Sequence, residues 1–90
     1  MRELIVELYS EPTNNAVVRI PGRKFPGVLV QGDSLRTLYL TADAIWRRAV
    51  EQGDSALTDE ALGLRETLSE VLGRYERVLE ENQLPFPYPK

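Results

Sequence analysis

Two Pro-Gly pairs, Pro21-Gly22 and Pro26-Gly27, enclose the segment Arg23-Lys24-Phe25. Proline presets φ at about −65° and glycine permits positive φ, so each pair favours a turn. The segment between the pairs is then an exposed loop with two cations and one aromatic ring. An aromatic anchor beside arginines is typical of the centre of a protein-binding surface. We predict a partner-binding surface made of Arg19, Arg23, Lys24, Phe25 and Pro26.

The residue types that most often carry catalysis are scarce in this chain. It has no histidine and no cysteine, so the commonest general base and the commonest metal ligands are missing. Its serines therefore have no histidine partner to activate them. The spacing Gly22-x-x-x-x-Gly27 lacks the Gly-Lys-Ser/Thr that would continue a phosphate-binding loop, and no Asp-x-Asp-x-Asp-Gly calcium loop is present. The sequence predicts a protein that is not an enzyme and that has no metal and no cofactor.

Length and charge narrow the class further. Ninety residues with 42% hydrophobic content suit one small folded domain over residues 1–90. The net charge of −3 is uneven, because residues 1–50 hold 7 Lys/Arg against 5 Asp/Glu, whereas residues 51–90 hold 4 against 9. Proteins that bind nucleic acids usually have a concentrated basic surface, and in this acidic chain only the loop around Arg23 comes near to such a surface. Nucleic-acid binding is therefore kept as the less favoured alternative. The first residues are interrupted by charges too often for a signal peptide or a membrane span, so we expect no membrane contact and a cytoplasmic location.

Three short β-strands are expected in the first third of the chain, at residues 4–9, 16–20 and 28–31. The first two are separated by a cluster of turn-forming residues, which predicts a β-hairpin. Alternation places Ala16, Val18 and Ile20 on the buried side of the second strand and turns Arg19 outward. Residues 1–31 are therefore predicted to form a three-stranded antiparallel meander.

Two helices are expected after the meander. Gly32-Asp33-Ser34 marks the change from strand to helix, where Asp33 or Ser34 accepts hydrogen bonds from free N–H groups. The first helix, at residues 33–52, has an apolar stripe that suits packing on a sheet; the stripe is Leu35, Leu38, Tyr39, Ala42, Ile45, Trp46, Ala49 and Val50. The predicted class is α+β, with Gly22, Gly27, Gly32, Asp33 and Ser34 as its structural motif.

The second helix is expected at residues 58–82, with Thr58 as its N-cap. Its apolar stripe contains Leu64, Leu68, Val71, Leu72, Tyr75, Val78 and Leu79. A helix of this length spans about 37 Å, so part of its apolar face is expected to contact a second copy in a homodimer. The alternative is that Gly63 or Gly73 interrupts the helix. The Pro-rich tail at residues 83–90 is predicted to be extended and to pack back on the body; the alternative is a strap that docks a partner.

The first half of the chain resembles the N-terminal domain of HicB-type antitoxins. The resemblance lies in Phe25-Pro26-Gly27, then Gly32-Asp33-Ser34-Leu35 and an Ala-rich amphipathic helix. It implies a β-β-β-α scaffold related to a degenerate RNase H fold. Residues 15–19 and 21–27 also resemble a small uncharacterised bacterial family with the motifs Asn-Ala-Val-Val-Arg and Pro-Gly-Arg-x-Phe-Pro-Gly.

The chain departs from the HicB pattern in two places. An acidic helix and a Pro-aromatic tail stand where those antitoxins carry a DNA-binding domain, and Arg23-Lys24-Phe25 replaces their usual acidic loop residue. We predict a non-catalytic protein of the antitoxin or immunity kind, which binds and neutralises a partner protein such as a toxin. The alternatives are a nucleic-acid-binding regulatory module that uses the basic loop and a small structural dimer. A further alternative is that the charges of the loop have no binding role and only keep this segment exposed to solvent.

Overall fold

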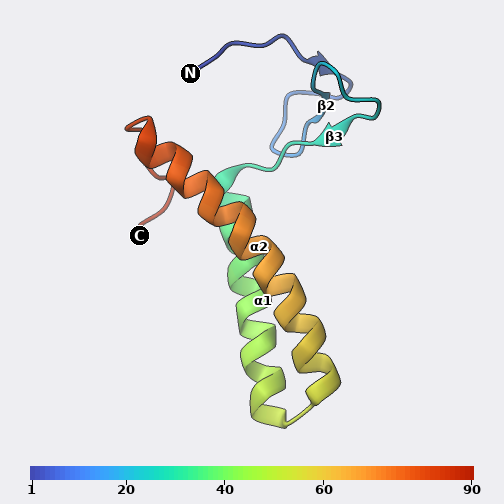
Figure 1. The fold of residues 1–90 in the computed structure, drawn as a ribbon, viewed down its shortest axis with the longest axis vertical. Coiled ribbons are helices and arrows are strands. Elements are labelled where there is room, and N and C mark those ends of the chain that lie inside the picture. Colours follow the sequence, from blue (N-terminus) through green and yellow to red (C-terminus); the bar gives the residue numbers. More distant parts are fainter. The chain divides into compact units, whose positions relative to one another are not determined.

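The computed structural model describes residues 1–90 and shows a three-stranded antiparallel sheet followed by two helices (Figure 1). The elements are β1 (Glu7–Leu8), β2 (Val17–Arg19), β3 (Gly27–Val28), α1 (Gly32–Gln52) and α2 (Ser55–Glu81). The predicted α+β class is therefore confirmed. Internal contacts divide the chain into two compact units, Met1–Gln31 and Gly32–Lys90, and each is described by itself.

The sheet is a meander in the order β1-β2-β3, with shorter strands than the sequence predicts. In the register that pairs Glu7 with Arg19, Ile5 would face Pro21, which has no N–H to donate and which opens a turn. β1 therefore begins at Glu7 and not at residue 4. The turn-forming residues 10–15 limit the other end of β2, so β3 is also cut short and ends at Val28.

α1 begins at Gly32, one residue before the predicted start, which places Asp33 inside the first turn. The Asp33 Oδ1 atom accepts a hydrogen bond of 2.8 Å from the backbone N–H of Ser34. Asp33 thus accepts from a free N–H group as predicted, although it does so from within the helix. At the other end, Gly53 adopts a φ of 70°, which ends α1 where the sequence places its end.

Thr58 is not the N-cap of α2, contrary to the prediction. Asp54 occupies that position, because its backbone is extended and its Oδ1 atom accepts a hydrogen bond of 3.0 Å from a backbone N–H in the first turn. The helix therefore begins at Ser55, three residues earlier than expected. It then continues for 27 residues through Gly63 and Gly73, so neither glycine interrupts it.

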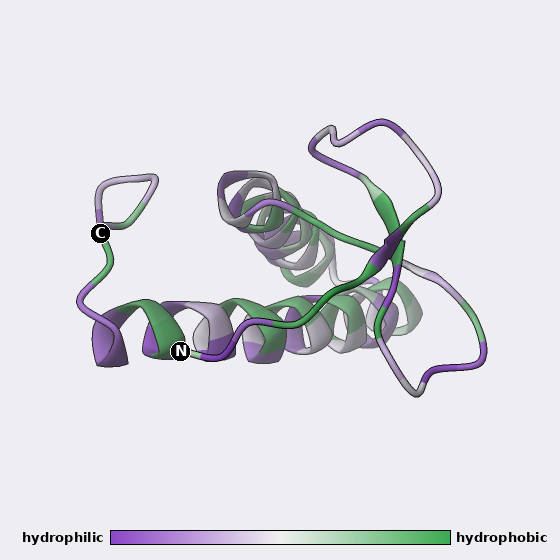
Figure 2. Ribbon diagram, turned by 90° about the horizontal axis from the view of Figure 1, so that it is seen from above, coloured by the Kyte–Doolittle hydropathy of each residue, from purple (hydrophilic) through white to green (hydrophobic).

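α1 and α2 form an antiparallel hairpin in which hydrophobic and hydrophilic residues alternate along both helices (Figures 1 and 2). The buried and half-buried positions that recur three or four residues apart are Gly32, Leu35, Tyr39, Ala42, Trp46 and Ala49 in α1, and Thr58, Ala61, Arg65, Leu68, Leu72, Tyr75 and Leu79 in α2. This spacing is the a/d pattern of a coiled coil, and we call these residues the seam. The apolar stripe of α1 was expected to pack on the sheet, but the partner that covers its seam residues is α2.

Part of each predicted apolar stripe lies outside the seam. The exposed members are Leu38, Ile45 and Val50 in α1 and Leu64, Val71 and Val78 in α2. They stay exposed because a single partner helix covers only the a/d positions. Neither α1 nor α2 combines the length and the apolar character that a membrane-crossing helix needs.

The tail after α2 packs against the helices, as the sequence predicts. Phe86 and Tyr88 are half-buried, and their rings meet edge to face at 5.8 Å between centroids. The Tyr88 hydroxyl donates a hydrogen bond of 2.8 Å to Glu76, and the Arg36 guanidinium lies 4.4 Å from the centroid of the Tyr88 ring. The tail therefore fixes one edge of the hairpin, where Arg36 and Glu76 lie.

Candidate functional site

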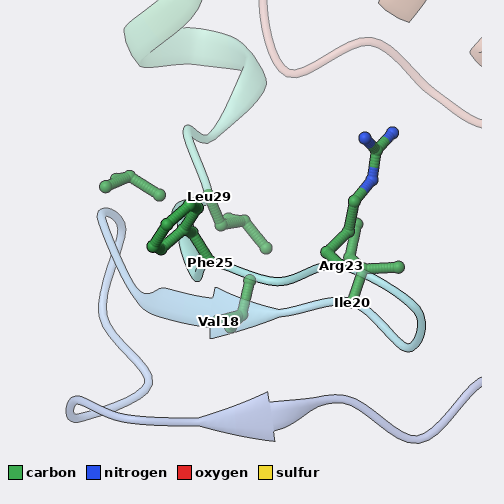
Figure 3. Close-up of a pocket in the computed structure, with 7 residues that line it drawn as sticks. Val18, Ile20, Arg23, Phe25 and Leu29 are labelled. Carbon is green, nitrogen blue, oxygen red and sulfur yellow. The ribbon is translucent and has the colours of Figure 1, made fainter.

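An open pocket of about 350 Å³ lies on one face of the sheet unit, between β2, β3 and the loop that joins them (Figure 3). Its lining residues are Val18, Ile20, Arg23, Phe25, Gly27, Val28 and Leu29. All of them belong to residues 18–29, so a single hairpin builds the whole pocket.

The alternation of β2 and a tight turn produce this arrangement. Val18 and Ile20 are two residues apart and therefore project from the same face of the strand. The backbone N–H of Arg23 donates a hydrogen bond of 3.1 Å to the carbonyl oxygen of Ile20, which closes a β-turn with Pro21 and Gly22 at its centre. Gly22 has a φ of 87°, the value that a type II turn requires at this position.

Gly27 keeps the floor of the pocket open. It pairs directly with Val18 across the sheet, so a side chain at position 27 would stand on the same face as Val18. A Cβ atom there would meet no other atom within 4 Å. Gly27 does not have a positive φ, so it does not provide the turn geometry that the sequence predicts. Its contribution to the pocket is the absence of a side chain.

The pocket offers an apolar surface with a cation at its rim. Figure 3 shows Val18, Ile20, Phe25 and Leu29 on the same side of β2, with the Arg23 guanidinium pointing away from the strand. Phe25 is 73% exposed. Lys24 holds its Nζ atom 5.4 Å from the centroid of the Phe25 ring. Neither Arg23 nor Lys24 forms an ion pair within the chain, so both charges are available to an acidic ligand.

The structure separates Arg19 from the other residues of the predicted surface. Arg19 projects from the opposite face of β2, where its Nε atom donates a hydrogen bond of 2.7 Å to Glu7. Its guanidinium also lies 5.8 Å from the centroid of the Tyr9 ring. The hydrogen bond from Arg19 lowers the pKa of the Glu7 carboxyl below its usual value. Arg19 is therefore engaged in a cross-strand pair, away from the pocket.

The remaining predicted residues divide between the two units. Arg23 and Phe25 line the pocket, while Lys24 and Pro26 belong to the same loop without lining it. Of the structural motif, Gly22 and Gly27 lie in the sheet unit, and Gly32, Asp33 and Ser34 open α1. The prediction missed the apolar lining, which is Val18, Ile20, Val28 and Leu29. The alternation of Val18 and Ile20 is visible in the sequence, but it predicts a buried sheet face, and no sequence signal assigns Val28 and Leu29 to a pocket.

Comparison with known proteins gives a family and no relative of known activity. No curated protein and no solved structure matches the chain. A family model described as a family of unknown function, DUF6959, matches residues 1–88, and the chain therefore belongs to that family.

Proposed function

We propose that this chain is a non-catalytic protein that binds a partner protein in the cytoplasm and neutralises it, as antitoxins and immunity proteins do. The single observation that carries the proposal is the pocket of residues 18–29, which combines exposed apolar walls with the unpaired cation Arg23 at its rim and the unpaired Lys24 next to it in the loop. Monomeric proteins seldom expose large apolar side chains in a cluster, and such clusters mark interaction sites. The resemblance of Phe25-Pro26-Gly27 and of Gly32-Asp33-Ser34-Leu35 to HicB-type antitoxins also favours this class of function, although the Arg23-Lys24-Phe25 loop departs from their pattern.

The chemistry of the pocket describes the part of the partner that it fits. An apolar or aromatic side chain would enter between Val18 and Phe25 and displace water from their surfaces. An acidic group next to it would meet Arg23 and Lys24. The partner is thus expected to present a hydrophobic residue beside Asp or Glu. The acidic composition of residues 51–90 would suit a partner whose active cleft is basic.

The test is affinity capture from the native host with the full chain and two loop variants, followed by mass spectrometry. Arg23→Glu/Lys24→Glu reverses the rim charges. Gly27→Leu fills the floor of the pocket, where the backbone has room for a side chain. The matched control is Arg2→Glu/Arg77→Glu, which reverses two exposed cations that also lack ion pairs.

We expect one stoichiometric protein in the captures by the wild type and by the control, and none with either loop variant. The captured protein should arrest growth when it is expressed alone and should permit growth when it is co-expressed with the wild-type chain. Capture by all four proteins alike would show that the pocket is not the site. A captured protein that is harmless when expressed alone would contradict neutralisation while leaving the pocket as a binding site.

A further inference from the structure

Six exposed apolar side chains lie along one edge of the helical hairpin. They are Leu38 and Ile45 of α1 and Leu57, Leu64, Val71 and Val78 of α2, and we call them the apolar strip. Each has between 38% and 53% of its surface exposed. Within each helix they recur every seven residues, which keeps them in line along the helix.

The strip lies on a single edge because the helices are antiparallel. Each strip residue directly precedes a seam residue at an a position, such as Tyr39 or Leu72, so each occupies a g position of the heptad. In an antiparallel pair the g positions of both helices lie on the same side of the seam. The opposite edge is made of e positions, and Tyr88 of the tail contacts Arg36 and Glu76 at one end of it. Nothing in residues 32–90 covers the strip.

The length of the strip indicates what could cover it. Leu57 and Val78 are separated by about 31 Å along α2, at 1.5 Å per residue. A surface that covers the whole strip must therefore present apolar side chains over about the same length. A second hairpin of the same chain carries an apolar strip of the same length.

The strip is also symmetric along the hairpin. Asp43 and Arg65 are joined by a hydrogen bond, and each is two residues from a threonine, Thr41 or Thr67, so these threonines lie at the same level. The apolar residues of both helices are centred on that level. A two-fold axis there, perpendicular to the helices, places Leu64 opposite the partner's Val71. The same axis places Leu57 opposite the partner's Val78.

The charges beside the strip obey the same symmetry. Glu60 and Arg74 both flank the strip on α2, and they are equally distant from Thr67. The two-fold axis therefore brings Glu60 to the partner's Arg74, and Arg74 to the partner's Glu60. Thr67 donates its hydroxyl to the carbonyl oxygen of Gly63 at 3.0 Å, so its burial at the axis leaves no hydrogen bond unmade. Thr41 does the same within α1.

We propose that the apolar strip is the interface of a homodimer, in which two hairpins pack about this axis as an antiparallel four-helix bundle. The interface lies on the helical unit, whereas the pocket proposed for the partner protein lies on the sheet unit. The two proposals can therefore fail independently. In a four-helix bundle each helix packs against two neighbours and buries apolar residues on two sides. This packing explains why the g positions of the strip are apolar in addition to the seam.

Sedimentation equilibrium of the full chain at micromolar concentration tests the dimer. The wild type is expected at twice the chain mass of 10.2 kDa. Leu64→Asp/Val71→Asp places charges in the strip and should weaken dimerisation roughly a hundredfold or more. The control Leu40→Asp/Val50→Asp changes two residues of similar exposure outside the strip, 49% and 51%, and should remain dimeric.

A charge exchange tests the axis even if the strip variant fails to fold. Glu60→Arg and Arg74→Glu should each weaken the dimer about tenfold, because each creates two like-charge contacts. The double variant restores both pairs and should recover the wild-type dissociation constant to within about threefold. Since the two residues lie about 21 Å apart in one helix, recovery requires a second chain. A monomeric wild type, a dimeric strip variant or a double variant as weak as the single ones would each overturn the proposal.

Discussion

Arg65 of α2 donates a hydrogen bond of 2.7 Å from its Nε atom to the Asp43 carboxylate of α1. The second oxygen of Asp43 accepts a hydrogen bond of 2.7 Å from Arg47, one turn further along α1. The Arg65 guanidinium also lies 5.6 Å from the centroid of the Tyr39 ring and 5.0 Å from that of Trp46. A cation at a seam position is thus paired with an acid and packed on two aromatic rings, which is how a charged residue is accommodated there.

Acid should weaken the hairpin through Asp43. The hydrogen bonds from Arg65 and then Arg47 lower the pKa of this carboxyl below its ordinary value of 3.8. A carboxyl with a lowered pKa in the folded chain stabilises the fold above the pKa of the unfolded chain, and this stabilisation is lost as the pH falls through the folded value. The free energy of unfolding should therefore fall on acidification, and it should fall less in Asp43→Asn. Urea unfolding of the wild type and of Asp43→Asn at neutral pH and at about pH 3 measures how far the free energy of unfolding of each protein falls.

Asp59→Asn is the matched control for Asp43→Asn. Asp59 is exposed on α2 and forms no ion pair, so its variant should follow the acid slope of the wild type. Equal slopes for Asp43→Asn and the wild type would mean that the pair with Arg65 does not contribute to stability.

Alanine at position 32 should destabilise the hairpin, although alanine favours helices. A Cβ atom on Gly32 would overlap the ring of Tyr75, which packs against the backbone at this point. The ring must move, and overpacking of this kind costs roughly 1–3 kcal/mol. Gly63→Ala is the control: its Cβ atom would meet no atom within 4 Å, so it should raise the free energy of unfolding by about 0.5–1 kcal/mol.

A double-mutant cycle identifies the cause of the Gly32 effect. If the Tyr75 ring is the obstacle, Gly32→Ala should cost much less in a Tyr75→Ala background than in the wild type. A cost that is the same in both backgrounds would assign the effect to the backbone of the first turn of α1.

Removal of the α2 N-cap should lower the free energy of unfolding by about 1 kcal/mol. Asp54→Ala deletes the carboxylate that accepts a hydrogen bond from the first turn, and losses of this kind lie near that value. Ser55→Ala, one residue further on, is the control and should stay within about 0.5 kcal/mol of the wild type. Thermal unfolding monitored by circular dichroism compares the three proteins. A larger loss for Ser55→Ala than for Asp54→Ala would place the cap elsewhere.

The element order could be predicted from the sequence because it depends on local signals. Pro21-Gly22, Gly32-Asp33 and Gln52-Gly53 act through backbone angles and free N–H groups within a few residues, and a β-turn, the start of α1 and the end of α1 lie at these positions. Local signals of the same kind predict the wrong start for α2, at residue 58 instead of Ser55. Asp54 and Thr58 are both good N-cap residues, and only the backbone geometry distinguishes them.

The faces of the elements were predicted less well, because burial depends on which element becomes the partner. Leu38 and Leu35 are equally apolar, yet only Leu35 lies in the seam that α2 covers. The pocket was missed for a related reason. Val18 and Ile20 alternate as a buried strand face does, but Gly27 lies opposite Val18 and has no side chain, which leaves that face open.

Phe25→Ala should separate binding from folding. Phe25 is 73% exposed, so its truncation should change the free energy of unfolding by no more than about 0.5 kcal/mol. If Phe25 is the anchor of the partner-binding pocket, the same change should cost about 2 kcal/mol of affinity for the captured partner, measured by calorimetry. The control is Phe86→Ala in the tail, which should reduce stability and leave affinity unchanged. Wild-type affinity in Phe25→Ala would remove the ring from the proposed site.

Alkaline pH should release the tail through Tyr88. Burial, followed by the hydrogen bond to Glu76, raises the pKa of the Tyr88 hydroxyl from its ordinary 10.0 to about 12. The folded chain therefore holds this proton after the unfolded chain has lost it, so the stabilisation is complete below about pH 10 and is lost as the pH rises toward 12. The ultraviolet titration difference between the wild type and Tyr88→Phe isolates this hydroxyl from the other tyrosines. Glu76→Gln should bring its pKa back toward 10, since the variant removes the neighbouring charge. Titration of Tyr88 at its ordinary pKa in the wild type would show that the tail does not pack on Glu76 in solution.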